Sequence, residues 1–208
     1  DMLDKYEDAI DFGKEIIPNS LADNLNVYGY MYDGYWEDVG DIKDYFEANL
    51  EMAGDQPRFT LFDKNNIVYT RGRMLPPSKL FDVKVSKSLI AEGSLIYAAE
   101  IQSSIIGIRS WIGKGTMIEK CYVIGNDEYS DLSTITTQDV KKIGGIGSNC
   151  ILKNAIVDKH VKIGDNCTII GDDSLEDMEE ESYCIPKGLI VINKGAIIPA
   201  GTKIGYLK

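Results

Sequence analysis

The chain has 208 residues, of which 44% are hydrophobic and 26% are charged, an ordinary composition for a globular protein of one or two domains. Its formal net charge of −11 makes it a poor general partner for nucleic acid or for an anionic membrane surface. No apolar run approaches the roughly 20 residues that a membrane-spanning helix needs, and no signal peptide is recognisable.

The four cysteines are far apart in the sequence, and His160 is the only histidine. This spacing argues against a zinc site and favours reduced, partly buried thiols in an intracellular compartment. Because Asp1 precedes Met2, we interpret the chain as a fragment or a processed product.

Residues 1–54 have the pattern of a mixed α/β segment, with about two helices and two strands. Apolar residues at helical intervals predict a helix over 3–10, and Pro18 to Ser20 then interrupt the chain. Strand formers fill residues 26–32, and Asp33-Gly34 signals a turn.

A second helix is predicted over residues 42–52, with Asp41 as its N-cap. Its apolar face is formed by Ile42, Tyr45, Phe46 and Leu50. Residues 1–54 are too few for a comfortable domain, so we interpret them as the end of a larger one. Residues 55–82 are predicted to be a connector, with prolines and with Arg71, Arg73 and Lys79 around an extended segment.

From about residue 83, aliphatic residues recur about every six positions, which fits neither a helix nor a lone strand. Hexapeptide repeats are a signature of a parallel β-helix, in which each short strand points one aliphatic side chain into a narrow prism. The predicted inward ladder comprises Ile90, Ile96, Ile106, Ile112, Ile118 and Ile124, then Val157, Ile163 and Ile169, and finally Ile192, Ile198 and Ile204.

Two excursions, at about 126–144 and 172–187, interrupt the repeat and are predicted to be loops, which often carry contacts. The acid-rich run at 172–181 is predicted to be a solvated loop, and the insertion at 126–142 a polar one. The β-helix itself says little about chemistry.

Several ordered motifs resemble glucose-1-phosphate adenylyltransferase (ADP-glucose pyrophosphorylase). They include "DFGKEIIP", "DGYWEDVGDIKDYFEANL", "RMLPPSKLFDVKVSKSLI" and "GIGSNCILKNAIVDKHVKIGDN", and they run nearly from end to end of the chain. The resemblance implies an α/β remnant of a Rossmann-like nucleotidyltransferase domain followed by a left-handed parallel β-helix. The implied organisation is a catalytic-domain end at 1–54, a connector at 55–82 and a regulatory and oligomerisation domain at 83–208.

The family transfers AMP from ATP to glucose 1-phosphate, using Mg²⁺, and forms tetramers in the cytoplasm or the plastid. Its Gly-rich nucleotide loop and its Lys-bearing sugar-phosphate motif do not occur in this sequence. Without such a loop nothing obviously cradles a triphosphate, so we expect the chain alone to be inactive, with no complete catalytic set.

Asp38 corresponds to the acid of the family's W-x-D-x-G motif, which the resemblance implies is an Mg²⁺ ligand. From the residues alone it could equally form a turn before Gly40. Trp36 corresponds to an aromatic that lines the glucose 1-phosphate pocket, or else is a core aromatic beside Tyr35. Glu37 is interpreted as solvent-facing or structural.

Asp11 and Phe12 correspond to family positions at the sugar pocket, where a carboxylate accepts hydrogen bonds from sugar hydroxyls. The alternative is a loop that turns at Gly13 and is capped by Asp11.

Lys159 and Lys194 correspond to lysines at which cyanobacterial and plant members bind the activator 3-phosphoglycerate. Arg71 and Arg73 fall where those enzymes place residues of the same anion site, although position 71 often holds Gln. Phosphate or phosphoglycerate effectors need such cations. Each of the four could also be a solvated surface cation.

Two other functions remain open. One is a regulatory, non-catalytic subunit of a hetero-oligomeric enzyme. The sequence does not distinguish this from a catalytic subunit, nor a homo-tetramer from a hetero-tetramer. The other is a hexapeptide-repeat acyltransferase, for which His160 would be the only candidate base.

Overall fold

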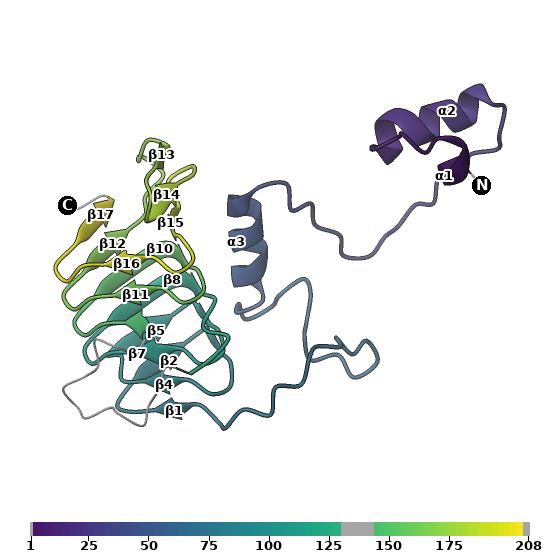
Figure 1. Ribbon diagram of the computed structural model, residues 1–208. Coiled ribbons are helices and arrows are strands. Elements are labelled where there is room, and N and C mark those ends of the chain that lie inside the picture. The colour runs from purple at the N-terminus through teal and green to yellow at the C-terminus, as the bar shows by residue number, and fades with distance from the viewer. Residues whose placement is uncertain (1, 130–143, 206–208) are drawn as a thin grey trace. The chain divides into compact units, whose positions relative to one another are not determined.

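The computed structural model describes residues 2–129 and 144–205 (Figure 1). It divides the chain into two compact units, Asp1–Trp36 and Glu37–Lys208. None of the helices in the described ranges is long and apolar enough to cross a membrane.

The first unit contains three short helical segments, α1 (Met2–Lys5), the π-helical η1 (Phe12–Ile16) and α2 (Ile17–Ala22). The helix predicted over 3–10 ends at Lys5, and Ile10 is 96% exposed, so no core retains a longer helix there. The predicted interruption at Pro18 is wrong. Pro18 lies in the first turn of α2, where its missing N–H has no intrahelical acceptor to lose.

No strand forms at residues 26–32, or elsewhere among the described residues of 1–54, so the strand predictions there are wrong. The strand-forming residues are present, but β-structure needs a hydrogen-bonding neighbour. No described segment pairs with residues 26–32, and Tyr28 and Tyr30 are 86% and 88% exposed.

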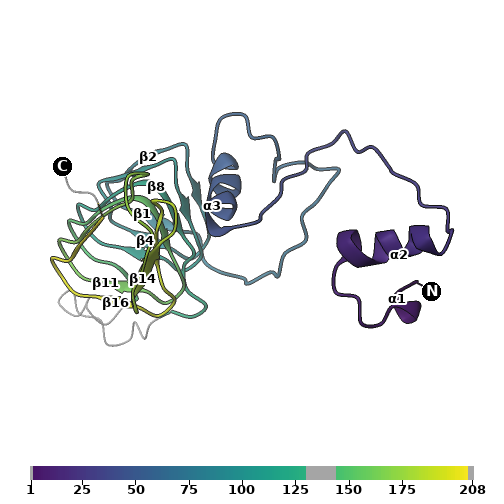
Figure 2. The same cartoon turned by 90° about the horizontal axis from the view of Figure 1, so that it is seen from above.

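The second unit is a parallel β-helix with one helix, α3 (Ile42–Glu51), packed on it (Figures 1 and 2). Its strands are β1 (Lys79–Leu80), β2 (Lys84–Ser86), β3 (Leu89–Ile90), β4 (Leu95–Ile96), β5 (Glu100–Gln102), β6 (Ile105–Ile106), β7 (Trp111–Ile112), β8 (Met117–Val123), β9 (Gly145–Ile146), β10 (Ile151–Val157), β11 (Lys162–Ile163), β12 (Thr168–Ile170), β13 (Met178–Glu179), β14 (Tyr183–Ile185), β15 (Ile190–Ile192), β16 (Ile197–Ile198) and β17 (Lys203–Gly205).

Successive coils pair strand upon strand in parallel, as the register shows. One sheet runs β1-β4-β7-β9-β11-β16, and a second follows the path β13-β14-β15-β10-β8-β5-β2. Lys79 pairs with Leu95, which in turn pairs with Trp111. Among the described strands, the parallel arrangement is broken at the acid-rich excursion, where β14 pairs antiparallel with both β13 and β15. That segment is largely exposed, as predicted for a solvated run, but it is a hairpin rather than an irregular loop.

The core is one column of aliphatic side chains along the prism. Its members include Ile96, Ile101, Ile106, Ile112, Ile118, Ile146, Leu152, Val157, Ile163, Ile169, Ile192, Ile198 and Ile204. The predicted inward position at Ile124 is wrong, because Val123 is in the column instead. Ile124 packs against a second cluster, the docking cluster, which consists of Phe46, Ile156, Leu189 and Val191. Ile118 and Val123 are five residues apart rather than six, so a fixed period of six is one residue out of register at this point.

Small hydroxyl side chains form a second, polar ladder that the hydrophobic pattern does not reveal. The Ser94 N–H donates to Ser78 Oγ and the Ser110 N–H donates to Ser94 Oγ, each at 3.1 Å and across 16 residues. Ser104 repeats the arrangement with Ser88. These contacts satisfy corner backbone groups that the short strands leave unpaired.

The α3 helix begins at Asp41, as predicted, because the Asp41 side chain accepts hydrogen bonds from the Lys43 and Asp44 N–H groups at 2.8 and 2.9 Å. Phe46 is buried against Leu189 and Val191 of the β-helix, whereas Ile42 of the predicted apolar face is exposed. The Lys187 ammonium donates a hydrogen bond to the Asp41 carboxylate, and Lys43 Nζ lies 2.8 Å from Asp173 Oδ1. Apolar packing and two ion pairs thus hold α3 on the solenoid.

Candidate functional site

Asp11 and Phe12 lie at the start of η1. Asp11 is its N-cap, because Oδ1 accepts a hydrogen bond from the Lys14 N–H at 2.8 Å, while the Asp11 N–H donates to Glu15 at 3.1 Å. The Phe12 ring is 64% exposed. The capping alternative for Asp11 is therefore what the structure describes, and a sugar contact at these residues stays a prediction.

Trp36 ends the first unit and Asp38 lies near the start of the second. Trp36 is 72% exposed, so the alternative of a core aromatic is not what the structure describes. Asp38 is also exposed, and no side chain of the described residues forms an ion pair with its carboxylate. Because the division falls between these two residues, the structure describes no single site that joins them.

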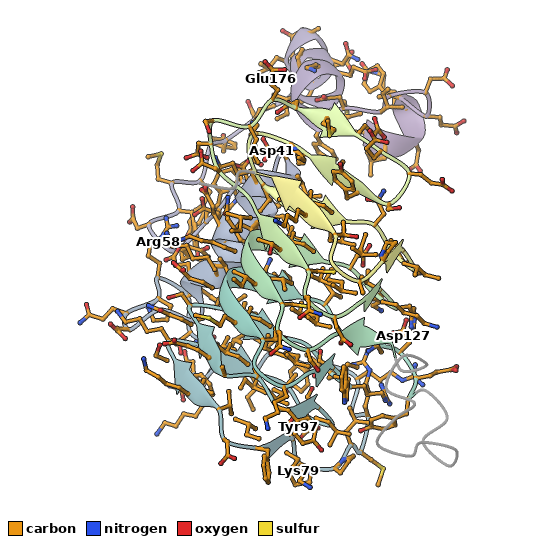
Figure 3. The ribbon with its side chains drawn as sticks, turned by 90° about the vertical axis from the view of Figure 1, so that its left-hand side faces the viewer. Asp41, Arg58, Lys79, Tyr97, Asp127 and Glu176 are labelled. Atoms are coloured by element: carbon orange, nitrogen blue, oxygen red, sulfur yellow. The ribbon has the colours of Figure 1, made fainter. Side chains whose placement is uncertain are left out.

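Glu37, beside Asp38, belongs to an ion-pair cluster centred on Arg58. One guanidinium nitrogen, Nη2, lies 2.9 Å from Glu37 Oε2 and 2.5 Å from Glu51 Oε2. Hydrogen bonds from the Arg58 side chain hold the pKa of Glu51 at about 2. This cluster ties the segment that carries Asp38 to the last turn of α3. Figure 3 shows Arg58 on the same side of the β-helix as Asp41.

A cavity of about 420 Å³ on the β-helix is lined by both Arg73 and Lys159. Its floor is apolar, with residues of β3, β6 and β8, and Asn126 and Asp127 complete the polar part of its lining. The structure therefore brings together two of the four predicted anion-site cations, which are far apart in the sequence.

Lys194 lies one coil above Lys159. Val157 pairs with Ile192 and Lys162 with Ile197, and between these two pairs the Gly195 N–H donates to the Lys159 carbonyl at 2.8 Å. Arg71 is exposed, lies two residues before Arg73, and is not among the residues that line the cavity.

Asp127 is the functional candidate that sequence reasoning missed. Its Oδ1 lies 2.7 Å from Lys159 Nζ, and its Oδ2 lies 3.2 Å from His160 Nε2. Hydrogen bonds from Lys159 and then from His160 lower the pKa of Asp127 below its ordinary value. The predicted polar loop 126–142 starts here, but residues 130–142 lie outside the described ranges. Only the register of the coils brings residue 127 beside residue 159.

The thiols of Cys121, Cys150 and Cys167 are buried in the β-helix, and Cys184 is partly exposed. Burial raises the pKa of Cys121 to about 12 and that of Cys150 to about 11. The thiols of Cys121 and Cys150 are therefore protonated and packed as small apolar groups at neutral pH.

Two family profiles match the chain in order. Residues 1–54 match the family described as nucleotidyl transferase, and residues 73–203 match the GLGC left-handed parallel beta-helix domain. The second match covers most of the second unit and gives the handedness of the solenoid.

A curated relative agrees with both matches. It is the glucose-1-phosphate adenylyltransferase small subunit, chloroplastic/amyloplastic, of Triticum aestivum, which is 38% identical over 213 residues. The alignment covers 98% of this chain and 44% of the relative, so the chain spans less than half the length of that protein. These findings favour a nucleotidyltransferase family over an acyltransferase with His160 as base. The chain belongs to the glucose-1-phosphate adenylyltransferase family, of which it carries the left-handed β-helix domain and a short nucleotidyltransferase segment.

Proposed function

We propose that the chain acts within an enzyme that transfers AMP from ATP to glucose 1-phosphate, giving ADP-glucose and pyrophosphate for glycogen or starch synthesis. The observation that carries this proposal is the 38% identity, over 98% of the chain, to a protein named as such an enzyme's small subunit. The ordered matches to a nucleotidyltransferase segment and a GLGC β-helix support it.

Four residues of the segment that matches the nucleotidyl transferase family would serve the substrates of that reaction. Asp38 offers an exposed carboxylate, the hard oxygen ligand that Mg²⁺ prefers, although a complete site needs further ligands. Bound Mg²⁺ neutralises charge on reacting phosphates. Trp36 and Phe12 offer exposed aromatic faces to a sugar, and Asp11 has oxygen lone pairs left beyond its cap for sugar hydroxyls.

The cations on the β-helix would bind an anionic effector such as phosphate or 3-phosphoglycerate. Arg73 and Lys159 line one cavity, and Lys194 lies one coil away from Lys159. Arg71 is close in sequence and adds a further positive charge. A guanidinium and an ammonium at one concave surface can hold a phosphate by charge-assisted hydrogen bonds.

The activity proposal is tested by assaying ADP-glucose synthesis from ATP, glucose 1-phosphate and Mg²⁺. We expect none from the 208-residue chain, and synthesis from the product of the complete open reading frame. In that product, Asp38→Asn should lower kcat by roughly 10²–10³-fold, since it removes a charge that acts on the reacting phosphates. Glu128→Gln, which removes an exposed acid of the β-helix, is the matched control.

Synthesis by the 208-residue chain would contradict the expectation that it lacks a nucleotide site. An inactive complete product that activates a catalytic partner would favour the second candidate, a regulatory subunit of a hetero-tetramer. That candidate is supported by the name of the wheat relative, a small subunit, and it leaves both plastid and cytoplasm as possible locations.

A further inference from the structure

One acidic side chain lies among the cations of the proposed anion site. Asp127 presents one carboxylate oxygen to Lys159 Nζ at 2.7 Å and the other to His160 Nε2 at 3.2 Å. Both oxygens are therefore engaged, and the ammonium that would bind an effector already has an anionic partner. Figure 3 shows Asp127 at the edge of the stacked strands, on the opposite side in that view from Arg58.

The same side chains line the cavity. Arg73, Asn126, Asp127 and Lys159 all belong to the lining of the 420 Å³ hollow. The Asn126 Nδ2 donates to the Arg109 carbonyl at 2.9 Å, which fixes the backbone just before Asp127. The backbone that carries the Asp127 side chain is therefore held in place by the preceding residue, Asn126.

The ion pair is exposed enough to open. The side chains of Lys159 and Asp127 are 37% and 45% exposed. Pairs of this kind contribute little to stability, so a competing anion can separate them at low cost.

We propose that Asp127 is an internal counter-anion, which occupies the Lys159 and His160 donors and competes with a phosphate-bearing ligand for them. This inference rests on the proposed anion site at Arg73, Lys159 and Lys194. A phosphate carries more charge than a carboxylate and has three acceptor oxygens, so it displaces Asp127 where a singly charged anion does not. Asp127 thereby lowers the affinity of the site for every anion that uses these donors.

The test is a calorimetric titration of the 208-residue chain with inorganic phosphate in a low-chloride buffer, and a parallel titration with acetate. Asp127→Asn keeps the shape of the side chain and removes its charge. Because removal of a unit charge about 4 Å away is worth a factor of about five even at the dielectric constant of water, we expect phosphate to bind at least about fivefold more tightly. Acetate, which carries a single charge, should gain by a smaller factor than phosphate.

Three further variants make the result specific. Glu119→Gln removes a comparably exposed ion pair, to Lys153 at 3.0 Å, elsewhere on the β-helix, and should leave phosphate binding unchanged. Lys159→Ala should abolish the gain when combined with Asp127→Asn. Asp127→Ala repeats the charge removal, and circular dichroism establishes which variants are folded.

The outcomes separate the two proposals. If the unmodified chain binds phosphate through Lys159, and both folded Asp127 variants bind it equally or less tightly, the counter-anion inference is wrong and the anion site stands. If phosphate binds no variant, or binds Lys159→Ala as well as the unmodified chain, the anion site fails and the counter-anion inference fails with it.

Discussion

Arg58 lies in the segment between α3 and β1, and it holds two glutamates, Glu37 and Glu51, that precede it in the chain. Its main-chain N–H also donates to Glu51 Oε1 at 2.9 Å, so both the backbone and the side chain of Arg58 contact that carboxylate. The planar guanidinium can serve two carboxylates at once, which a lysine cannot do with the same geometry. This cluster gives the segment around Asp38 a defined attachment to α3.

The Glu51 carboxyl should titrate at about pH 2, because Arg58 stabilises its charged form. Since the folded pKa lies below the ordinary value of 4.5, the contribution of this pair is fully present above about pH 4.5. It is lost as the pH falls towards 2. Carboxyl-carbon NMR titration measures this directly, and Arg58→Ala should return the pKa of Glu51 towards 4.5.

Lys64→Ala, which removes another cation from the segment between α3 and β1, is the control and should leave the pKa of Glu51 unchanged. A Glu51 carboxyl that titrates near its ordinary value in the unmodified chain would show that the ion pair does not form in solution.

At the scale of one element, α3 lies within the segment that matches the nucleotidyl transferase family but packs on the β-helix. Phe46 is 4% exposed and contacts the cluster of Ile156, Leu189 and Val191, and the Tyr45 ring lies 5.9 Å from that of Tyr122. The helix therefore links the segment around Asp38 to the solenoid. The boundaries predicted at residues 54 and 82 stay predictions.

Phe46→Ala should release α3 without unfolding the solenoid. Loss of a buried phenyl ring costs about 3–5 kcal/mol, and this ring belongs to the docking cluster rather than to the inner column. Hydrogen exchange should accelerate over Ile42–Glu51 and remain slow around Ile112. Glu47→Ala, at the exposed neighbouring position, should change neither rate. Equal acceleration in both regions would mean that α3 and the β-helix unfold as one unit.

At the scale of the whole molecule, stacked glycines let the coils approach each other closely. A Cβ on Gly113 would lie 2.6 Å from the Gly147 backbone, and a Cβ on Gly147 would lie 2.6 Å from the Gly164 backbone. These contacts are with main chain, which cannot move without disturbing the ladder between coils. Each coil is stable only through its neighbours, so a local clash affects the whole stack.

Gly147→Ala should destabilise the β-helix by about 1–3 kcal/mol, the usual cost of forcing extra atoms into a packed site. Urea denaturation followed by circular dichroism measures this change. Gly29→Ala is the control, because a Cβ at Gly29 has no atom within 4 Å. An unchanged unfolding midpoint for Gly147→Ala would refute the close approach of the coils.

The repeat was readable from the sequence because an inward side chain at almost every turn leaves a period that only a solenoid satisfies. The exact register could not be predicted, because coils of 16 and 17 residues break a strict period of six, and the Ile124 prediction was one position out for this reason. The serine ladder was also visible as spacing, at Ser78, Ser94 and Ser110, but its role depends on knowing which backbone groups the corners expose.

The first 54 residues were predicted less well. Strand propensity at 26–32 is real, but a strand is completed by its neighbours and not by its own residues. By contrast, the Asp41 cap was predictable because an N-cap bonds to residues only two or three positions away.

The sequence by itself determined the family, the solenoid and the types of residue that suit a sugar, a metal and an anion. These conclusions follow from local patterns and ordered motifs that can be recognised in the amino-acid sequence alone. Only the tertiary structure decided that Arg73 and Lys159 line one cavity, that Asp127 forms an ion pair with Lys159, and that α3 packs on the β-helix. The physical reason is that such contacts join residues separated by whole coils, and the number of residues in each turn and excursion sets which of them meet.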